Sequence, residues 1–116
     1  MTRTFVQTHE FSRCWDDLGF DDESLRLLEL EIMNDPEKFP VIQGTGGLRK
    51  ARIALQGTGK RGGARVCFVD FVFAETVYLI TVYEKKEKSD LLPSECHAIK
   101  KRIDILKKNL GGHSYE

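Results

Sequence analysis

The chain has 116 residues, of which 41% are apolar and 31% are charged, and its 18 basic side chains balance 18 acidic ones. This length and composition fit one globular domain over residues 1–116 and exclude wholesale disorder. No apolar run approaches the roughly 18 residues of a membrane-spanning helix, and the N-terminus lacks the apolar core of a signal peptide. We therefore expect a cytoplasmic domain with no membrane contact.

The neutral total conceals a basic central segment. Residues 38–69 contain seven basic side chains and no acidic one, whereas residues 1–37 contain ten acidic and three basic ones. Seven glycines are interleaved with these cations, so both backbone and charge can approach a polyanion closely. The segment therefore predicts contact with a nucleic acid backbone. Its basic residues are Lys38, Arg49, Lys50, Arg52, Lys60, Arg61 and Arg65.

The first third of the chain predicts a short strand and two helices. Residues 3–8 alternate weakly, and Thr8 is a suitable cap for the helix that follows and that Gly19 ends. Either Asp21 or Asp22 can cap the second helix, which an Asn-Asp-Pro sequence stops. The apolar positions recur at helical spacing and are Phe11, Trp15 and Leu18 in the first helix and Leu25, Leu28 and Ile32 in the second.

The basic segment predicts a β-hairpin. After an extended connection that ends in a glycine turn, residues 48–55 alternate, so that Lys50 and Arg52 share one face of a strand and Arg49 lies on the other. Residues 57–63 predict the hairpin loop. Two further cations lie at its tip, Lys60 and Arg61.

The remaining segments predict two central strands and a last helix. Arg65 opens an apolar strand that extends to residue 73, and residues 77–83 form another. The phase of burial is ambiguous around Asp70, and we expect a bulge there. A charged run over residues 84–88 leaves the sheet, and a helix starts near Pro93. These elements predict an α+β fold: a three-strand antiparallel meander and a short N-terminal strand, packed with two N-terminal helices and one C-terminal helix.

On this meander the cations form a concave patch with a specific chemistry. Hairpin pairing brings Arg65 close to Lys50 and Arg52, and guanidinium groups bind phosphate through two parallel hydrogen bonds. In RNA the 2′-hydroxyl can attack the adjacent phosphate once a base removes its proton, so neither a metal nor a protein nucleophile is required. A lysine crowded by other cations is a reasonable base, and Lys50 or Lys86 can take that role.

Simpler interpretations apply to some of these residues. Charged side chains usually mark solvated faces, and the mixture of Lys85, Lys86 and Lys88 with two glutamates partly cancels their charge. Aromatic side chains on central strands pack in the core more often than they stack on bases. Three scattered cysteines and three scattered histidines predict free thiols, no metal site and no cofactor.

Three stretches together resemble a known family. They are Ile42-Gln-Gly-Thr-Gly-Gly-Leu-Arg-Lys-Ala-Arg52, Gly57-Thr-Gly-Lys-Arg-Gly-Gly-Ala-Arg65 and Leu79-Ile-Thr-Val-Tyr-Glu-Lys-Lys-Glu-Lys-Ser-Asp-Leu91. On these motifs the chain is identified as a member of the RelE/HigB family of bacterial toxins, in the HigB-like branch with a long glycine-rich hairpin. The resemblance covers roughly residues 40–92, and the flanking helices agree in order and length.

The resemblance implies a RelE/ParE-like fold and a type II toxin–antitoxin system. The implied activity is that of a ribosome-dependent, metal-independent endoribonuclease that cuts messenger RNA in the decoding site, in contact with ribosomal RNA. The implied partner is an antitoxin with a helix-turn-helix DNA-binding domain. By position, Arg65 and Lys86 would contact the scissile phosphate, and Lys50 and Arg52 would serve as base or transition-state stabiliser. The remaining RNA-binding candidates are Arg49, Lys60, Arg61, Lys85, Lys88 and Tyr83.

Two departures from the family pattern accompany this resemblance. Lys86 stands where some relatives have arginine, which removes the two-pronged contact, and no tyrosine lies near Leu92, so Tyr83 is the candidate replacement. Two other functions keep the same fold. One is an RNA-binding module that blocks translation without cutting, and the other is a gyrase-directed toxin on the ParE scaffold.

Overall fold

The computed structural model describes residues 2–54 and 63–111, and over these ranges the chain adopts the predicted α+β fold. The hairpin tip with Lys60 and Arg61 lies outside the described residues. No helix within the described ranges is long and apolar enough to cross a membrane. The elements are β1 (Thr4–Gln7), α1 (His9–Asp17), α2 (Asp22–Asn34), η1 (Pro36–Lys38), β2 (Arg49–Ala54), β3 (Gly63–Phe71), η3 (Val72–Ala74), β4 (Thr76–Glu84) and α3 (Pro93–Asn109), where η denotes a short 3₁₀ turn.

The strands form one mixed sheet in the order β1-β4-β3-β2. Strands β2, β3 and β4 pair antiparallel as a meander, and β1 pairs parallel to β4. The two strands that carry the basic residues, β2 and β3, are therefore neighbours. Of these, β2 lies at the edge of the sheet and β3 in its interior. This arrangement confirms the predicted meander with its short N-terminal strand.

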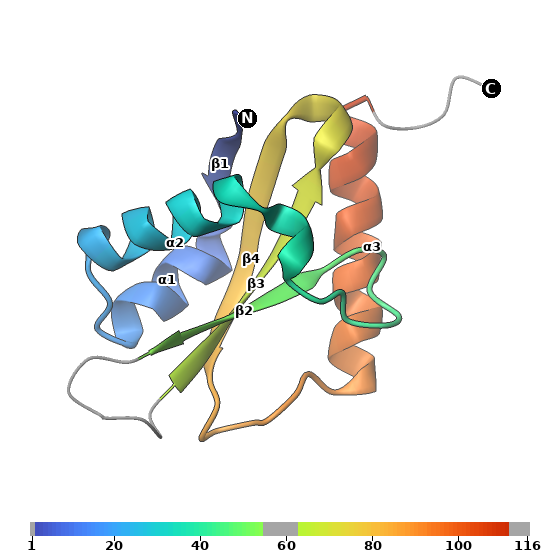
Figure 1. The fold of residues 1–116 in the computed structure, drawn as a ribbon. Coiled ribbons are helices and arrows are strands. Elements are labelled where there is room, and N and C mark those ends of the chain that lie inside the picture. The colour runs from blue at the N-terminus through green and yellow to red at the C-terminus, as the bar shows by residue number, and fades with distance from the viewer. Residues whose placement is uncertain (1, 55–62, 112–116) are drawn as a thin grey trace.

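Helices cover both faces of the sheet (Figure 1). Helices α1 and α2 lie together on one face, where Phe11, Trp15, Leu28 and Ile32 pack on Val66, Phe68 and Leu79. Helix α3 lies on the other face, where Ile99 and Ile103 pack on Cys67, Val69 and Ile80. Side chains that alternate along β3 therefore enter two separate cores, which explains why nearly every residue of this strand is apolar.

Capping residues fix the ends of the helices. The Thr8 hydroxyl accepts the N–H of Phe11 at 3.1 Å, and the Asp21 carboxylate accepts the N–H of Ser24 at 2.8 Å. Beyond α1, Gly19 adopts φ +82°, a conformation that favours glycine. The hydrogen bond to Ser24 lowers the pKa of Asp21. Both predicted N-terminal caps are thus confirmed, and Asp21 is the cap of α2.

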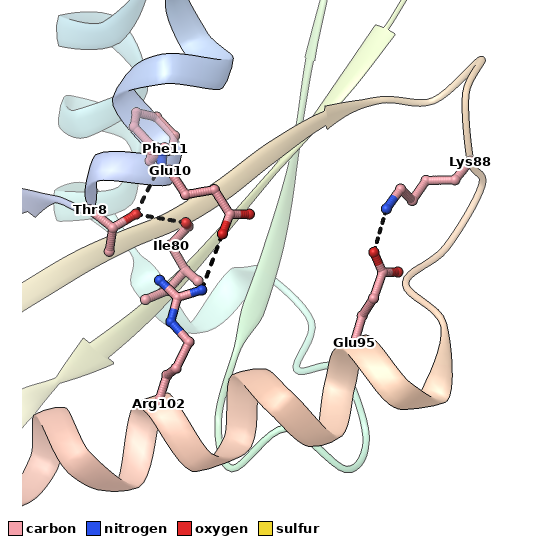
Figure 2. A network of polar contacts seen from close by, with 7 residues as sticks. All are labelled: Thr8, Glu10, Phe11, Ile80, Lys88, Glu95 and Arg102. Atoms are coloured by element: carbon pink, nitrogen blue, oxygen red, sulfur yellow. Dashed lines mark hydrogen bonds and ion pairs between the residues drawn. The ribbon is translucent and has the colours of Figure 1, made fainter.

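Polar contacts also attach the start of α1 to the central strand β4 and attach α3 to α1 (Figure 2). The Thr8 hydroxyl donates to the carbonyl of Ile80 at 2.8 Å, which holds the start of α1 on the strand. Arg102 of α3 pairs with Glu10 of α1 at 3.2 Å. Helix α3 therefore packs on the sheet through its apolar face and is also joined to α1, on the other side of the sheet, by an ion pair.

The boundaries of β3 differ from the prediction. The strand begins at Gly63, two residues before Arg65, and ends at Phe71. Residues Val72 and Phe73 lie instead on the η3 turn with 64% and 52% of their surface exposed. The chain must reverse here to pair with β4, and Glu75 adopts φ 49° to close the turn. Local apolar content could not reveal this reversal.

The predicted bulge at Asp70 is also wrong. The register shifts between Cys67 and Phe68, so the extra residue is Ile80 on β4. Asp70 follows the regular register opposite Val77, and its carboxylate accepts hydrogen bonds from Arg3 at 2.7 and 3.2 Å. A polar residue in this apolar strand therefore reflects an ion pair with the N-terminus.

Candidate nucleic-acid interface

The strand register places the basic side chains in one row across the sheet. Arg52 of β2 lies opposite Arg65 of β3, which lies opposite Tyr83 of β4. Lys50 lies two residues from Arg52 and opposite Cys67. Paired residues of adjacent strands, and residues two apart on one strand, project to the same face. Lys50, Arg52 and Arg65 thus share the face that carries α3.

These three cations line a cavity of about 380 Å³, here called the cation cavity. Its remaining walls come from Phe39 and Pro40, which precede β2, and from Asp90, which follows β4. Three cations face a single carboxylate, so the cavity carries a net positive charge. A concave site of this charge is suited to an anion such as a phosphodiester.

Arg52 and Arg65 repel each other electrostatically across the two strands. Like charges directly opposite each other on neighbouring strands are destabilising. Arg65 is only 8% exposed, and its Nε is buried without a hydrogen-bond partner. Within the described residues no carboxylate forms an ion pair with either arginine. Such an arrangement is stabilised when an anion occupies the cavity, which favours a binding or catalytic role.

Asp90 is the member of this site that the sequence interpretation did not identify. Its carboxylate lies 3.7 Å from the Nζ of Lys50. The side chain of Asp90 is 71% exposed, so the pair contributes little stability and can separate when a phosphate enters. From the sequence alone, a single acid between β4 and α3 has the pattern of an ordinary solvated loop residue. Only the return of the loop toward β2 places it in the cavity.

The predicted lysines of the run after β4 lie in different surroundings. Lys85 and Lys86 are exposed on the turn that follows β4, and neither lines the cation cavity. The Nζ of Lys88 forms an ion pair of 2.6 Å with Glu95 of α3 (Figure 2). The same Nζ lies 5.5 Å from the ring centre of Tyr83. This pairing lowers the pKa of Glu95.

Tyr83 and Arg49 are separated from the cation cavity by their packing. Tyr83 is 7% exposed and belongs to the core beneath α3, and burial raises the pKa of its hydroxyl to about 12. The same hydroxyl is buried without a hydrogen-bond partner. Arg49 projects to the other face of β2, where its Nη1 donates to the carbonyl of Phe39 at 2.7 Å. Arg49 thereby holds the segment that walls the cavity.

The residue opposite Lys50 on β3 is a buried cysteine, Cys67. Cys67 is fully buried, and this burial raises its pKa to about 12, although nearby Lys50 and Arg65 act in the opposite direction. Cys67 is therefore a neutral packing residue and not a nucleophile at neutral pH. All three cysteines are free, and the described residues contain no cluster of three or more potential metal ligands.

Comparison with protein families assigns the chain. Residues 3–111 match the family described as the RelE toxin of the RelE/RelB toxin–antitoxin system. The chain belongs to the RelE toxin family. This match confirms the family resemblance seen in the motifs, whereas placement in the HigB-like branch stays a prediction.

Solved structures share the fold. An arginine-to-alanine double mutant of Escherichia coli RelE in the free state superposes with a TM-score of 0.53 at 17% identity, over 89% of this chain and 99% of that one. A chain of the intact E. coli RelBE toxin–antitoxin complex gives a TM-score of 0.51 at 17% identity, over 70% of this chain and 94% of that one. At this identity the comparison shows a shared α+β fold.

Proposed function

We propose that this RelE-family protein is a cytoplasmic endoribonuclease that cuts messenger RNA on the ribosome, with the cation cavity as its active site. The observation that carries the proposal is the opposed Arg52–Arg65 pair, joined by Lys50 in a single hollow. These like charges are unfavourable beside one another, and a phosphodiester bound among them would reduce their repulsion. Family membership supports the toxin role.

The proposed reaction uses the ribose of the substrate as nucleophile. A base removes the 2′-hydroxyl proton, the 2′-oxygen bonds to the adjacent phosphorus, and the bond from phosphorus to the 5′-oxygen breaks as that oxygen takes up a proton. The products are a 2′,3′-cyclic phosphate and a 5′-hydroxyl. Negative charge builds on the phosphoryl oxygens in the transition state, and fixed guanidinium groups stabilise it.

The residues divide these tasks by their position. Arg65 is buried at the back of the cavity, and its guanidinium group suits a two-pronged contact with the scissile phosphate. Arg52 is exposed on the edge strand and can stabilise the same charge from the solvent side. Lys50 is partly exposed and is the proposed base, a role it can take once the entering phosphate has separated it from Asp90. Lys86 on its exposed turn would contact the RNA from the rim, with Lys85 beside it.

An antitoxin is the proposed protein partner. One chain of the E. coli RelBE toxin–antitoxin complex has the same fold as this chain. We propose that the partner of this chain carries a helix-turn-helix domain and blocks access of RNA to the cation cavity. Masking of Lys50 and Arg52 would suffice, because both lie at the border of the sheet.

Mapping of transcript ends tests the proposal. A short pulse of expression should create new 5′ ends within translated messages, and Arg65→Ala should remove them and restore growth. Lys101→Ala, a change of an exposed cation on α3 away from the cavity, is the matched control and should leave the ends in place. Growth arrest without new ends would indicate a translation blocker, and arrest of DNA replication would indicate a gyrase-directed toxin.

A further inference from the structure

A second cavity of about 450 Å³ lies beside the cation cavity, and the proposed reaction does not use it. We call it the α3 cavity, because the start of α3 forms one wall and the glycine turn before β2 forms the other. The lining residues that enter the argument are Ile42, Gln43, Asp90, Leu91, Pro93 and His97.

The walls of the α3 cavity are well fixed. The N–H of Ile42 donates to the carbonyl of Leu48 at 2.7 Å, and the Thr45 hydroxyl donates to the carbonyl of Ile42 at 2.6 Å. The turn also packs closely on α3, since a Cβ at Gly46 would lie 3.5 Å from the side chain of Lys100. Figure 1 shows this turn alongside α3. The hollow is thus a built feature between two packed segments.

The α3 cavity continues directly from the cation cavity. Phe39 and Pro40 wall the cation cavity, and the same segment reaches the α3 cavity at Ile42 and Gln43. Asp90 lines both cavities. A strand of RNA whose phosphate lies among Lys50, Arg52 and Arg65 would therefore place an adjacent nucleotide at the α3 cavity.

The chemistry of the two cavities is complementary. No lysine or arginine is among the described residues that line the α3 cavity, so it is unsuited to a second phosphate. Ile42, Leu91 and Pro93 give apolar surface, which suits the face of an unpaired base. Gln43, His97 and Asp90 add polar groups that can bond a base edge, and a carboxylate accepts from an exocyclic amino group.

On this basis we infer that the α3 cavity is a nucleobase subsite, and that it sets the base preference next to the cut. The inference rests on the proposed function, in which RNA is the substrate that brings a base to this cavity. Asp90 supplies only acceptor oxygens when ionised, and Gln43 and His97 hold the base edge against it, so the subsite favours bases with an exocyclic amino group over uracil.

Two variants test the inference against a matched control. Gln43→Ala and His97→Ala remove polar groups of the α3 cavity without touching Lys50, Arg52 or Arg65, and His9→Ala removes an exposed histidine at the start of α1. In transcript-end maps, wild type should disfavour uracil at one fixed position beside the cut. Each cavity variant should weaken that bias roughly fivefold, the effect of losing one good base contact. His9→Ala should leave it unchanged.

Binding measurements separate this inference from the proposed activity. The probes are fluorescent tetranucleotides with 2′-O-methyl riboses, which cannot be cut and which differ at a single base. Wild-type protein should prefer a base with an exocyclic amino group over uracil at one position, and Gln43→Ala and His97→Ala should each weaken the preference roughly fivefold while retaining overall affinity. If wild type binds all tetranucleotides equally, or if both variants keep the wild-type preference, the subsite is refuted. Base discrimination without cleavage by wild type would refute the enzyme and keep the subsite.

Discussion

Replacing Arg65 by methionine should make the protein more stable and abolish its activity. Methionine matches the arginine side chain as far as Nε and suits an almost fully buried site, since Arg65 is 8% exposed. The change removes a buried Nε that has no hydrogen-bond partner and also removes the like-charge contact with Arg52. An unsatisfied buried donor costs about 1–3 kcal/mol. The other guanidinium nitrogens are hydrated in the cavity, and losing that hydration offsets part of the gain. We therefore expect the free energy of unfolding to rise by about 1 kcal/mol.

The expected gain corresponds to an increase in melting temperature of about 3–5 °C for a domain of this size. Cleavage of ribosome-bound RNA should fall about 10²–10³-fold, the typical effect of removing one preorganised donor to a developing negative charge. Thermal unfolding followed by circular dichroism and a single-turnover cleavage assay measure the two effects on the same preparation.

Arg3 provides a matched control, because it is a buried arginine that does have a partner. Its side chain and that of Asp70 are each 7% exposed and lie 2.7 Å apart. Arg3→Met leaves the Asp70 carboxylate uncompensated and should destabilise the fold by about 3 kcal/mol. Activity at a temperature where the variant stays folded should be unchanged. If Arg65→Met lowers the melting temperature as Arg3→Met does, Arg65 is a structural residue, and the reasoning fails.

Three further results are expected from the same structure. Arg52→Ala should lower the salt dependence of RNA binding by about 0.7 in the slope of log affinity against log salt concentration, and an unchanged slope would remove Arg52 from the interface. The free energy of unfolding should fall as the pH rises from 9 toward 12, because folded Cys67 keeps a proton that the unfolded chain loses. Urea titrations of Cys67→Ala should show a flatter decline, and an equal decline would contradict the assigned burial. Glu95→Gln should cost less than about 1 kcal/mol at pH 7 and progressively less below pH 4, because the lowered pKa of Glu95 contributes stability only while the carboxylate is charged. A loss that persists in acid would show that packing and not charge is responsible.

Much of the fold follows from local patterns. The helical stripes predict the faces of α1 and α2, and the cap residues Thr8 and Asp21 predict two helix starts. The alternation over β2 correctly predicts that Lys50 and Arg52 share a face, because side chains two apart on a strand always do. These features depend on residues close together in the chain.

The features that sequence could not reveal depend on long-range pairing. The position of the bulge depends on how β3 aligns with β4, and Asp70 disturbed the alternation for a different reason, its ion pair with Arg3. Asp90 enters the cation cavity only because the segment after β4 returns toward β2. Tyr83 was predicted from its place at a strand end, yet α3 covers it, and docking of that helix is a tertiary event.

The chemistry of the cut ends tests the central claim most directly. Purified protein should be incubated with ribosomes that hold a defined messenger RNA, and both new termini should be identified by mass spectrometry. If the ribose attacks its own phosphate among Lys50, Arg52 and Arg65, the upstream fragment ends in a 2′,3′-cyclic phosphate and the downstream fragment begins with a 5′-hydroxyl. A 3′-hydroxyl paired with a 5′-phosphate would show that water is the nucleophile and would contradict the account.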